Sequence, residues 1–197
     1  MDGLASNVIE LHAAGGRSAQ GSRPEQQDEF VILPPEELPS ELKDTVALFG
    51  VFDGHGSDAV SKFAKAHLPH LIISSPEFHA GDYESAMQKA VNQVDRLLLQ
   101  GFKKGEDKFA IAGSTASLAV LDLKRGILVV GNVGDSHILM GKRDAAGGFV
   151  EKITRLTEDH KPEQDGEKQR IEQAGGQVHC QHDISRIGKS FLFVIHS

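Results

Sequence analysis

The segment that most constrains the fold is the stretch 47–56, where an apolar run ends abruptly at Asp53-Gly54-His55-Gly56. Mostly hydrophobic residues bounded by glycines predict a buried strand. A carboxylate, an imidazole and two glycines at the end of such a strand place a hard-metal ligand and a proton-transfer group on a tight turn. An ordinary strand-ending turn is the alternative interpretation, because Asp and Gly are common turn residues.

Two amphipathic helices are predicted after this strand. Apolar residues recur at helical spacing over residues 57–73, where Ser57 or Asp58 is available as the N-cap. The same pattern recurs over residues 82–102. On the other side of the strand, the adjacent prolines of the segment 34–39 exclude a strand or a helix interior and predict a loop.

Short strands dominate the second half of the chain. Apolar or alternating runs separated by turn signals predict an antiparallel meander, with strands over 115–123, 126–132, 136–142 and 149–156. A polar surface helix is predicted over residues 163–174, with Gly175-Gly176 as its C-cap. Strands, then two helices, then a meander form an α+β order, unlike regular βαβ alternation.

The composition places limits on function. The chain has 197 residues, of which 39% are hydrophobic and 25% charged, and this predicts one globular domain. A net charge of −7 argues against nucleic-acid binding. We expect no contact with a membrane, since no apolar run approaches the roughly 20 residues that span a bilayer. The N-terminus does not resemble a signal peptide, and Cys180 is the only cysteine, so a cytoplasmic location, with the nucleus as an addition, is expected.

Six motifs occur in one order along the chain. They are Gln20–Asp28 (QGSRPEQQD), Val51–Gly56 (VFDGHG), Gly113–Ala116 (GSTA), Gly131–Ser136 (GNVGDS), Leu156–Pro162 (LTEDHKP) and Glu167–Gly176. In sequence and order they resemble the metal-dependent protein serine/threonine phosphatases of type 2C, the PPM type. The resemblance implies two stacked antiparallel β-sheets flanked by helices. It also implies hydrolysis of phosphoserine and phosphothreonine in proteins by metal-activated water.

By this resemblance the metal site contains two Mg²⁺ or Mn²⁺ ions and a weaker third. Asp53 would bridge two ions, and the Gly54 carbonyl would add a ligand that needs no side chain. Gln27 and Asp28 match positions that hold water ligands and steady the site. Asp135 matches a carboxylate that helps to hold the third ion, although a plain hairpin turn explains its surroundings almost as well.

Two further residues match catalytic positions of the family. His55 matches the candidate general acid, which would protonate the departing seryl or threonyl oxygen; a core histidine bonded to a backbone carbonyl is the alternative. Arg23 matches the residue that clamps the substrate phosphate with its planar guanidinium; an exposed solvated arginine is the alternative. The family usually has Arg where this chain has His137. The segment Gly113–Ala116 is interpreted as framework, namely the entry into a strand.

The resemblance predicts how the chain is divided. We expect residues 1–14 to form a flexible arm, 15–187 a partial phosphatase domain, and 188–197 a divergent tail. Near the start of the domain, Arg17–Gly21 resembles the family's entry strand. Beyond the segment that matches residue 187, family members have two more metal-binding aspartates, so we expect the fold to be incomplete at its C-terminus. A translated intron or a shortened gene model would explain such a tail.

The sequence leaves two classes of function open. The first is a phosphatase that acts on phosphorylated proteins, as a monomer. The second is a catalytically inactive phosphatase-like interaction module, or a truncated fragment. The presence of Asp53, His55 and Arg23 favours the first as the ancestry of the chain, and the missing aspartates favour the second for this polypeptide.

Overall fold

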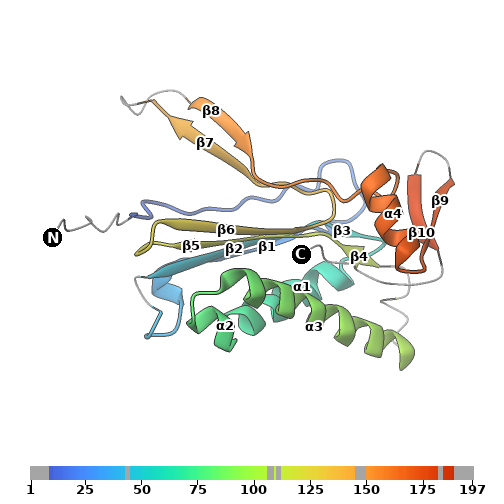
Figure 1. Ribbon diagram of the computed structural model, residues 1–197, viewed down its shortest axis with the longest axis horizontal. Coiled ribbons are helices and arrows are strands. Elements are labelled where there is room, and N and C mark those ends of the chain that lie inside the picture. Colours follow the sequence, from blue (N-terminus) through green and yellow to red (C-terminus); the bar gives the residue numbers. More distant parts are fainter. Residues whose placement is uncertain are drawn as a thin grey trace.

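The computed structural model describes residues 9–42, 45–105, 109, 112–144, 150–181 and 184–188. At its centre lies a four-stranded antiparallel sheet with the order β1-β2-β5-β6. The strands are β1 Glu29–Leu33, β2 Val46–Phe52, β5 Ala116–Asp122 and β6 Ile127–Val133. Figure 1 shows the strands side by side, with helices beneath one face of the sheet. The predicted α+β class, with antiparallel sheets and flanking helices, is therefore confirmed.

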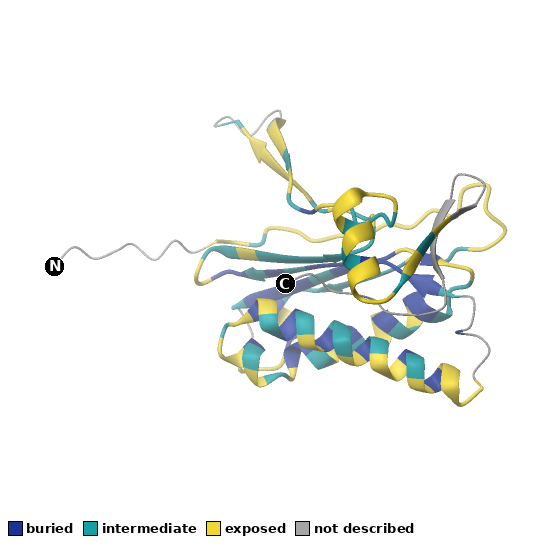
Figure 2. Ribbon diagram, turned by 45° about the vertical axis from the view of Figure 1, so that its right-hand side comes forward, coloured by how far each residue is buried: buried dark blue, intermediate teal, exposed yellow. Residues whose placement is uncertain are grey.

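The helical layer consists of α1 Ala59–Ile73, α2 Pro76–His79 and α3 Tyr83–Lys103. Alternate residues of the central strands point toward it, and Phe52, Leu118 and Val120 are almost completely buried there. Figure 2 shows the buried residues along the sheet and along one side of each long helix. Apolar burial between these two layers is the main source of stability.

Both predicted long helices are confirmed, with differences at their N-termini. Helix α1 begins at Ala59, two residues later than predicted, and the side chain of its N-cap residue Asp58 caps no backbone N–H. Asp58 pairs instead with Lys62 at 2.6 Å. Helix α3 has a capped start, because the Asp82 carboxylate accepts a hydrogen bond from the Ser85 N–H at 3.2 Å.

Three small two-stranded sheets and a fourth α-helix complete the described elements. The pairs are β3 Gly54–His55 with β4 Gly113–Ser114, β7 Leu139–Arg143 with β8 Val150–Arg155, and β9 Gln177–Gln181 with β10 Ile184–Gly188; the helix is α4 Asp165–Gln173. Helix α4 matches the predicted polar helix, but its C-cap is Ala174 rather than the expected glycine pair, and the left-handed Gly175 follows it. No helix in the described ranges is long and apolar enough to cross a membrane.

The predicted meander is only partly correct. All four of its strands form, but β6 pairs with β5 in the central sheet, whereas β7 and β8 form a separate hairpin. The turn after β6 contains Gly134 with a φ of 98°, which redirects the chain. Figure 1 shows the hairpin projecting on the side of the sheet opposite the helices. Strand spacing in the sequence could not distinguish one continuous sheet from two.

The N-terminal part of the chain also differs from expectation. Arg17–Gly21 forms no strand. The chain just before this segment lies against β1, because a Cβ added at Gly16 would overlap the ring of Phe30. The expected loop 34–39 contains a short 3₁₀ turn, Pro35–Glu37, for which a proline at the first position is suitable. Residues 1–8 of the expected arm and 189–197 of the expected tail lie outside the described residues.

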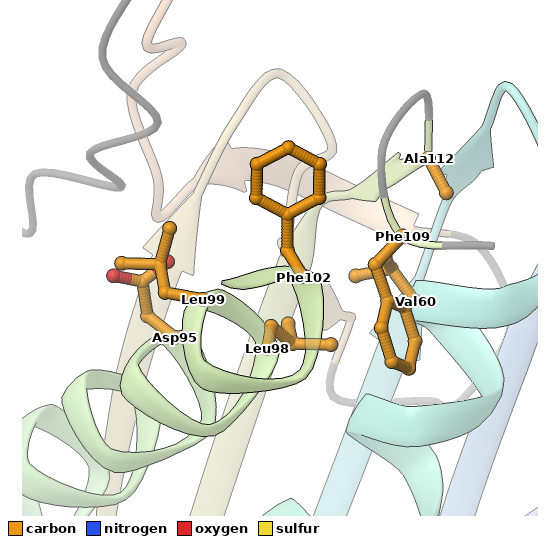
Figure 3. Close-up of a pocket in the computed structure, with 7 residues that line it drawn as sticks. All are labelled: Val60, Asp95, Leu98, Leu99, Phe102, Phe109 and Ala112. Carbon is orange, nitrogen blue, oxygen red and sulfur yellow. The ribbon is translucent and has the colours of Figure 1, made fainter. Parts of the chain in front are cut away.

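A single carboxylate lies in an apolar pocket between the long helices. Figure 3 shows Asp95 of α3 among the pocket residues Val60, Leu98, Leu99, Phe102, Phe109 and Ala112. Desolvation by these side chains raises the pKa of Asp95 from 3.8 to about 6, although the nearby Arg96 lowers it. Such a raised pKa makes stability depend on pH.

Asp95→Asn should stabilise the protein at alkaline pH. The pKa of Asp95 is higher in the folded chain, so its contribution to stability is complete below pH 3.8 and is lost as the pH rises through about 6. We expect the variant to have a free energy of unfolding higher by roughly 2 kcal/mol at pH 8, and nearly unchanged at pH 4. Denaturant unfolding at both pH values measures this, with the exposed Glu163→Gln as control. An equal effect of Asp95→Asn at both pH values would contradict it.

Candidate metal centre

Asp53 is held at the end of the central strand β2 by two backbone contacts with Thr115. The Asp53 N–H donates to Thr115 Oγ1 at 3.0 Å, and the Thr115 N–H donates to the Asp53 carbonyl at 2.9 Å. Thr115 separates β4 from β5, and its side chain is buried. The contacts use the main chain of Asp53 and leave its carboxylate free for other partners, and the residue as a whole is exposed at the end of the strand.

Two other carboxylates approach Asp53 from neighbouring strands. Glu29 of β1 pairs with Phe52 of β2, so Asp28, one residue before β1, lies across from Asp53, one residue after β2. Asp135 lies in the turn that follows β6. Desolvation raises the pKa of Asp53, and the charges of Asp28 and Asp135 raise it further, whereas His55 lowers it. Three segments far apart in the sequence thus converge at one end of the sheet with like charges, an arrangement that a cation would relieve.

Gly54 is surrounded too closely for any side chain. A Cβ at this position would overlap the backbone carbonyl of Gln27 and lie 2.8 Å from Ser61 Oγ. The same carbonyl accepts a hydrogen bond from Ser61 Oγ at 2.6 Å. Ser61 belongs to α1 and is completely buried. The contact therefore ties the Gln27-Asp28 segment to the helix that follows the Asp53 turn.

His55 is positioned by the short β3–β4 pair. It lies opposite Gly113, and its imidazole occupies the space that a side chain at Gly113 would need. The residue itself is exposed. The alternative of a buried core histidine is thereby excluded, and the ring is accessible from solvent on the same turn as Asp53.

Arg23 lies in an exposed turn before β1. Its backbone N–H donates to the Gln20 carbonyl at 3.3 Å, and the Gln20 side chain donates to the Arg23 carbonyl at 2.8 Å. In the part of the chain that the structure describes, no hydrogen bond or ion pair joins its guanidinium to Asp28 or Asp53. The structure therefore places Arg23 on the segment leading into the site, without bringing its side chain into contact with the carboxylates.

The turn that carries Asp135 is fixed on two sides. Ser136 Oγ lies 2.8 Å from Thr115 Oγ1, which connects the turn to the backbone of Asp53. On the other side, the Gly134 carbonyl accepts hydrogen bonds from Asn132 Nδ2 at 3.1 Å and from the His160 N–H at 3.0 Å. The turn is thus a defined element of the site rather than a free loop.

His137, which stands where the family usually has Arg, lies beside an ion pair. Its Nδ1 is 3.0 Å from Arg155 Nη2 and 3.6 Å from Asp159 Oδ1. Arg155 and Asp159 are themselves paired. A cation is therefore still present next to the Asp135 turn, but it comes from β8.

The described residues do not contain a complete metal site. Among them, no three Asp, Glu, His or Cys side chains form a group arranged to hold a metal ion. The donors that do converge are carboxylate and carbonyl oxygens, which suit Mg²⁺ and Mn²⁺ rather than zinc. The residues present thus fit part of the coordination shell of such an ion.

Three residues for which the sequence predicted no role in the site make contacts with it. Thr115 was interpreted as framework, yet its hydroxyl contacts the backbone of the candidate bridging residue. Gly113 makes room for His55, and Ser61 bonds the chain next to Asp28. Each contact joins residues more than 30 positions apart, and no local pattern signals it.

Comparison with known proteins agrees with this arrangement. The sequence model of the family Protein phosphatase 2C matches residues 13–191. "Protein phosphatase 2C homolog 2" of Schizosaccharomyces pombe is 31% identical over 196 residues, which cover 95% of this chain and 49% of the relative. "Probable protein phosphatase 2C 69" of Arabidopsis thaliana is 40% identical over 164 residues, which cover 83% and 42%. The crystal structure of a serine-threonine phosphatase 2C from Toxoplasma gondii aligns with a TM-score of 0.68 at 29% identity, covering 84% of this chain and 56% of that one.

Fold and matches together define an enzyme class, the protein phosphatases. The chain belongs to the protein phosphatase 2C family, a family of serine/threonine phosphatases. It spans no more than about half the length of the curated relatives named above.

Gly54→Ala should destabilise the fold, because the new Cβ meets a backbone carbonyl that cannot rotate away. We expect the free energy of unfolding to fall by roughly 1–3 kcal/mol, measured by thermal or denaturant unfolding. Gly166→Ala is the matched control: nothing lies within 4 Å of its added Cβ, and the residue is in helix α4. Alanine favours a helix over glycine, so the control should be neutral or slightly stabilising. Equal stability of the two variants would contradict the close packing around Gly54.

Proposed function

We propose that this protein is a metal-dependent phosphatase that hydrolyses phosphoserine and phosphothreonine in proteins. The single observation that carries the proposal is the convergence of Asp53 with Asp28 and Asp135 at one end of the central sheet. Membership in the protein phosphatase 2C family supports it and favours an enzyme over a binding module. The similar crystal structure from Toxoplasma gondii is that of a serine-threonine phosphatase, which supports the same substrate class.

The metal ions would be Mg²⁺ or Mn²⁺. Asp53 and the Gly54 carbonyl would bind them directly, with Asp53 between two ions, while Asp28 and Gln27 would hold coordinated water, and Asp135 would contribute to a weaker third position. When bound, such ions neutralise phosphoryl charge and activate a water molecule for attack. The tight packing around Gly54 supports this role, since it fixes the main-chain carbonyl next to Asp53.

His55 and Arg23 would act on the phosphate ester itself. The exposed His55 imidazole, held against Gly113, would donate a proton to the departing alkoxide oxygen. Arg23 would bind the phosphate oxygens with its planar guanidinium. Its exposed turn leaves the side chain accessible to a substrate.

We further propose that residues 15–187 form part of a phosphatase domain of a monomeric protein. The family match over residues 13–191 supports the extent of this region. The curated relatives are about twice as long as the region that matches this chain. The activity and the phosphorylated protein substrates are therefore proposed for the protein as a whole.

Asp53→Asn should abolish Mn²⁺-dependent hydrolysis of a phosphopeptide while the protein stays folded. The amide keeps the size of the side chain and the backbone contacts with Thr115, but it removes the charge. Turnover with and without Mn²⁺, together with thermal unfolding, measures both effects. Asp58→Asn is the control, since Asp58 is five residues away in the sequence and its carboxylate pairs with the exposed Lys62. Near-normal turnover by Asp53→Asn would refute the bridging role.

His55→Ala should have an effect that depends on the leaving group. A seryl alkoxide needs a proton in order to depart, whereas a nitrophenolate leaves without one. We therefore expect kcat to fall about 10²–10⁴-fold for a phosphoserine peptide, and far less for p-nitrophenyl phosphate. The exposed His12→Ala serves as control. A similar decrease for both substrates would show that His55 is not the general acid.

A further inference from the structure

We infer that Thr115 is a positioning residue that couples Asp53 to the Asp135 turn through its hydroxyl group. The expected effect of this coupling on metal binding rests on the proposed function, since Asp53 and Asp135 are two of the proposed metal-binding carboxylates. The contacts themselves are independent of that function. They form a chain from the Asp53 N–H to Thr115 Oγ1 and from there to Ser136 Oγ.

The hydroxyl of Thr115 can satisfy both partners at once. A hydroxyl group has one hydrogen to donate and two lone pairs that accept. Thr115 Oγ1 accepts from the Asp53 N–H at 3.0 Å and still has a hydrogen and a lone pair for Ser136 Oγ at 2.8 Å. Because Thr115 is only 9% exposed, water cannot readily replace either partner. A buried hydrogen bond of this kind is costly to leave unmade.

The methyl group of Thr115 makes a second contact with the same turn. A Cβ added to Gly134 would lie 2.7 Å from Thr115 Cγ2, so the methyl group packs directly against the Gly134 backbone. Gly134 has a φ of 98°, which L side chains rarely adopt. Thr115 therefore contacts the turn through both branches of its side chain. Serine would keep only the hydroxyl contact, and valine only the methyl contact.

The far side of the turn is already anchored. Asn132 Nδ2 donates to the carbonyls of Gly134 and Glu158, and its Oδ1 accepts from Ser117 Oγ at 2.6 Å. These bonds fix Gly134 relative to β5 and β6 but do not reach Asp53. The bond between Thr115 and Ser136 is the step that extends this fixed structure to the candidate bridging residue.

The coupling opposes a repulsion that the site itself creates. Asp53 and Asp135 carry like charges and are close enough to interact. Without a constraint the turn could relax away from Asp53, and a divalent ion would then have to draw it back on binding. Thr115 holds the two backbones in place beforehand, so less of the binding energy is used for rearrangement.

The first test uses metal-free protein and amide hydrogen exchange. Ser136 does not touch the Asp53 N–H, so Ser136→Ala should accelerate exchange of that amide only if Thr115 transmits the change. We expect acceleration of several-fold in the wild-type background and none in Thr115→Val, in which exchange is already fast. Thr157→Val is the matched control: Thr157 is also buried and accepts a backbone N–H, from Ile138 at 3.1 Å, but has no bond to Asp53. Unchanged exchange at Asp53 in Ser136→Ala would overturn the inference.

The second test is Mn²⁺ binding, measured by titration calorimetry. Thr115→Val should raise the Mn²⁺ dissociation constant about 10-fold or more, whereas Thr115→Ser, which keeps the hydroxyl, should stay within about 3-fold of wild type. Thr157→Val should lose stability without losing affinity. Equal affinity of Thr115→Val and wild type, or equal losses in the valine and serine variants, would overturn the inference. If wild-type protein bound no Mn²⁺ while the exchange coupling held, the proposed function would fail and the coupling would stand.

Discussion

The pairing of β2 with both β1 and β5 decides where Asp53, Asp28 and the Thr115 that contacts Asp53 lie. β2 is flanked by these two strands, and its last residue leads directly into Asp53. The antiparallel register with β1 brings Asp28 to the same end of the sheet, and the connection between β4 and β5 brings Thr115 there. A shift of one residue in either register would turn the side chains to the opposite face and separate these groups. The site is therefore a consequence of strand register.

The helical layer keeps this register in place. Alternate residues of β2 and β5 are buried against α1 and α3, so a register shift would expose Phe52 and Leu118 to water. Helix α1 also contributes directly to the site, because Ser61 on its buried face holds the Gln27 carbonyl. The same packing destabilises the charged form of Asp95, whose carboxylate lies among apolar side chains in the second half of α3.

Much of this could be predicted from the sequence because the signals are local. The apolar run that ends at Asp53-Gly54-His55, the helical periodicity before Ile73 and along α3, and the glycines after α4 each depend on neighbouring residues. The motif order also predicted the family, which the comparison confirms. The assignments of Asp53, His55 and Arg23 to chemical roles remain predictions, since they depend on a bound ion and a bound substrate.

What the sequence determined by itself is the set of elements and the residue types at their ends, because hydrophobic period and turn chemistry act over a few residues. Tertiary structure alone decided that β7 and β8 leave the central sheet, that Gly113 makes room for His55, and that Thr115 connects Asp53 to Ser136. These contacts join positions from 21 to 62 residues apart. The sequence around Thr115 does not reveal the hydrogen-bond partners of its hydroxyl group, because these partners come close to it only when the strands pair.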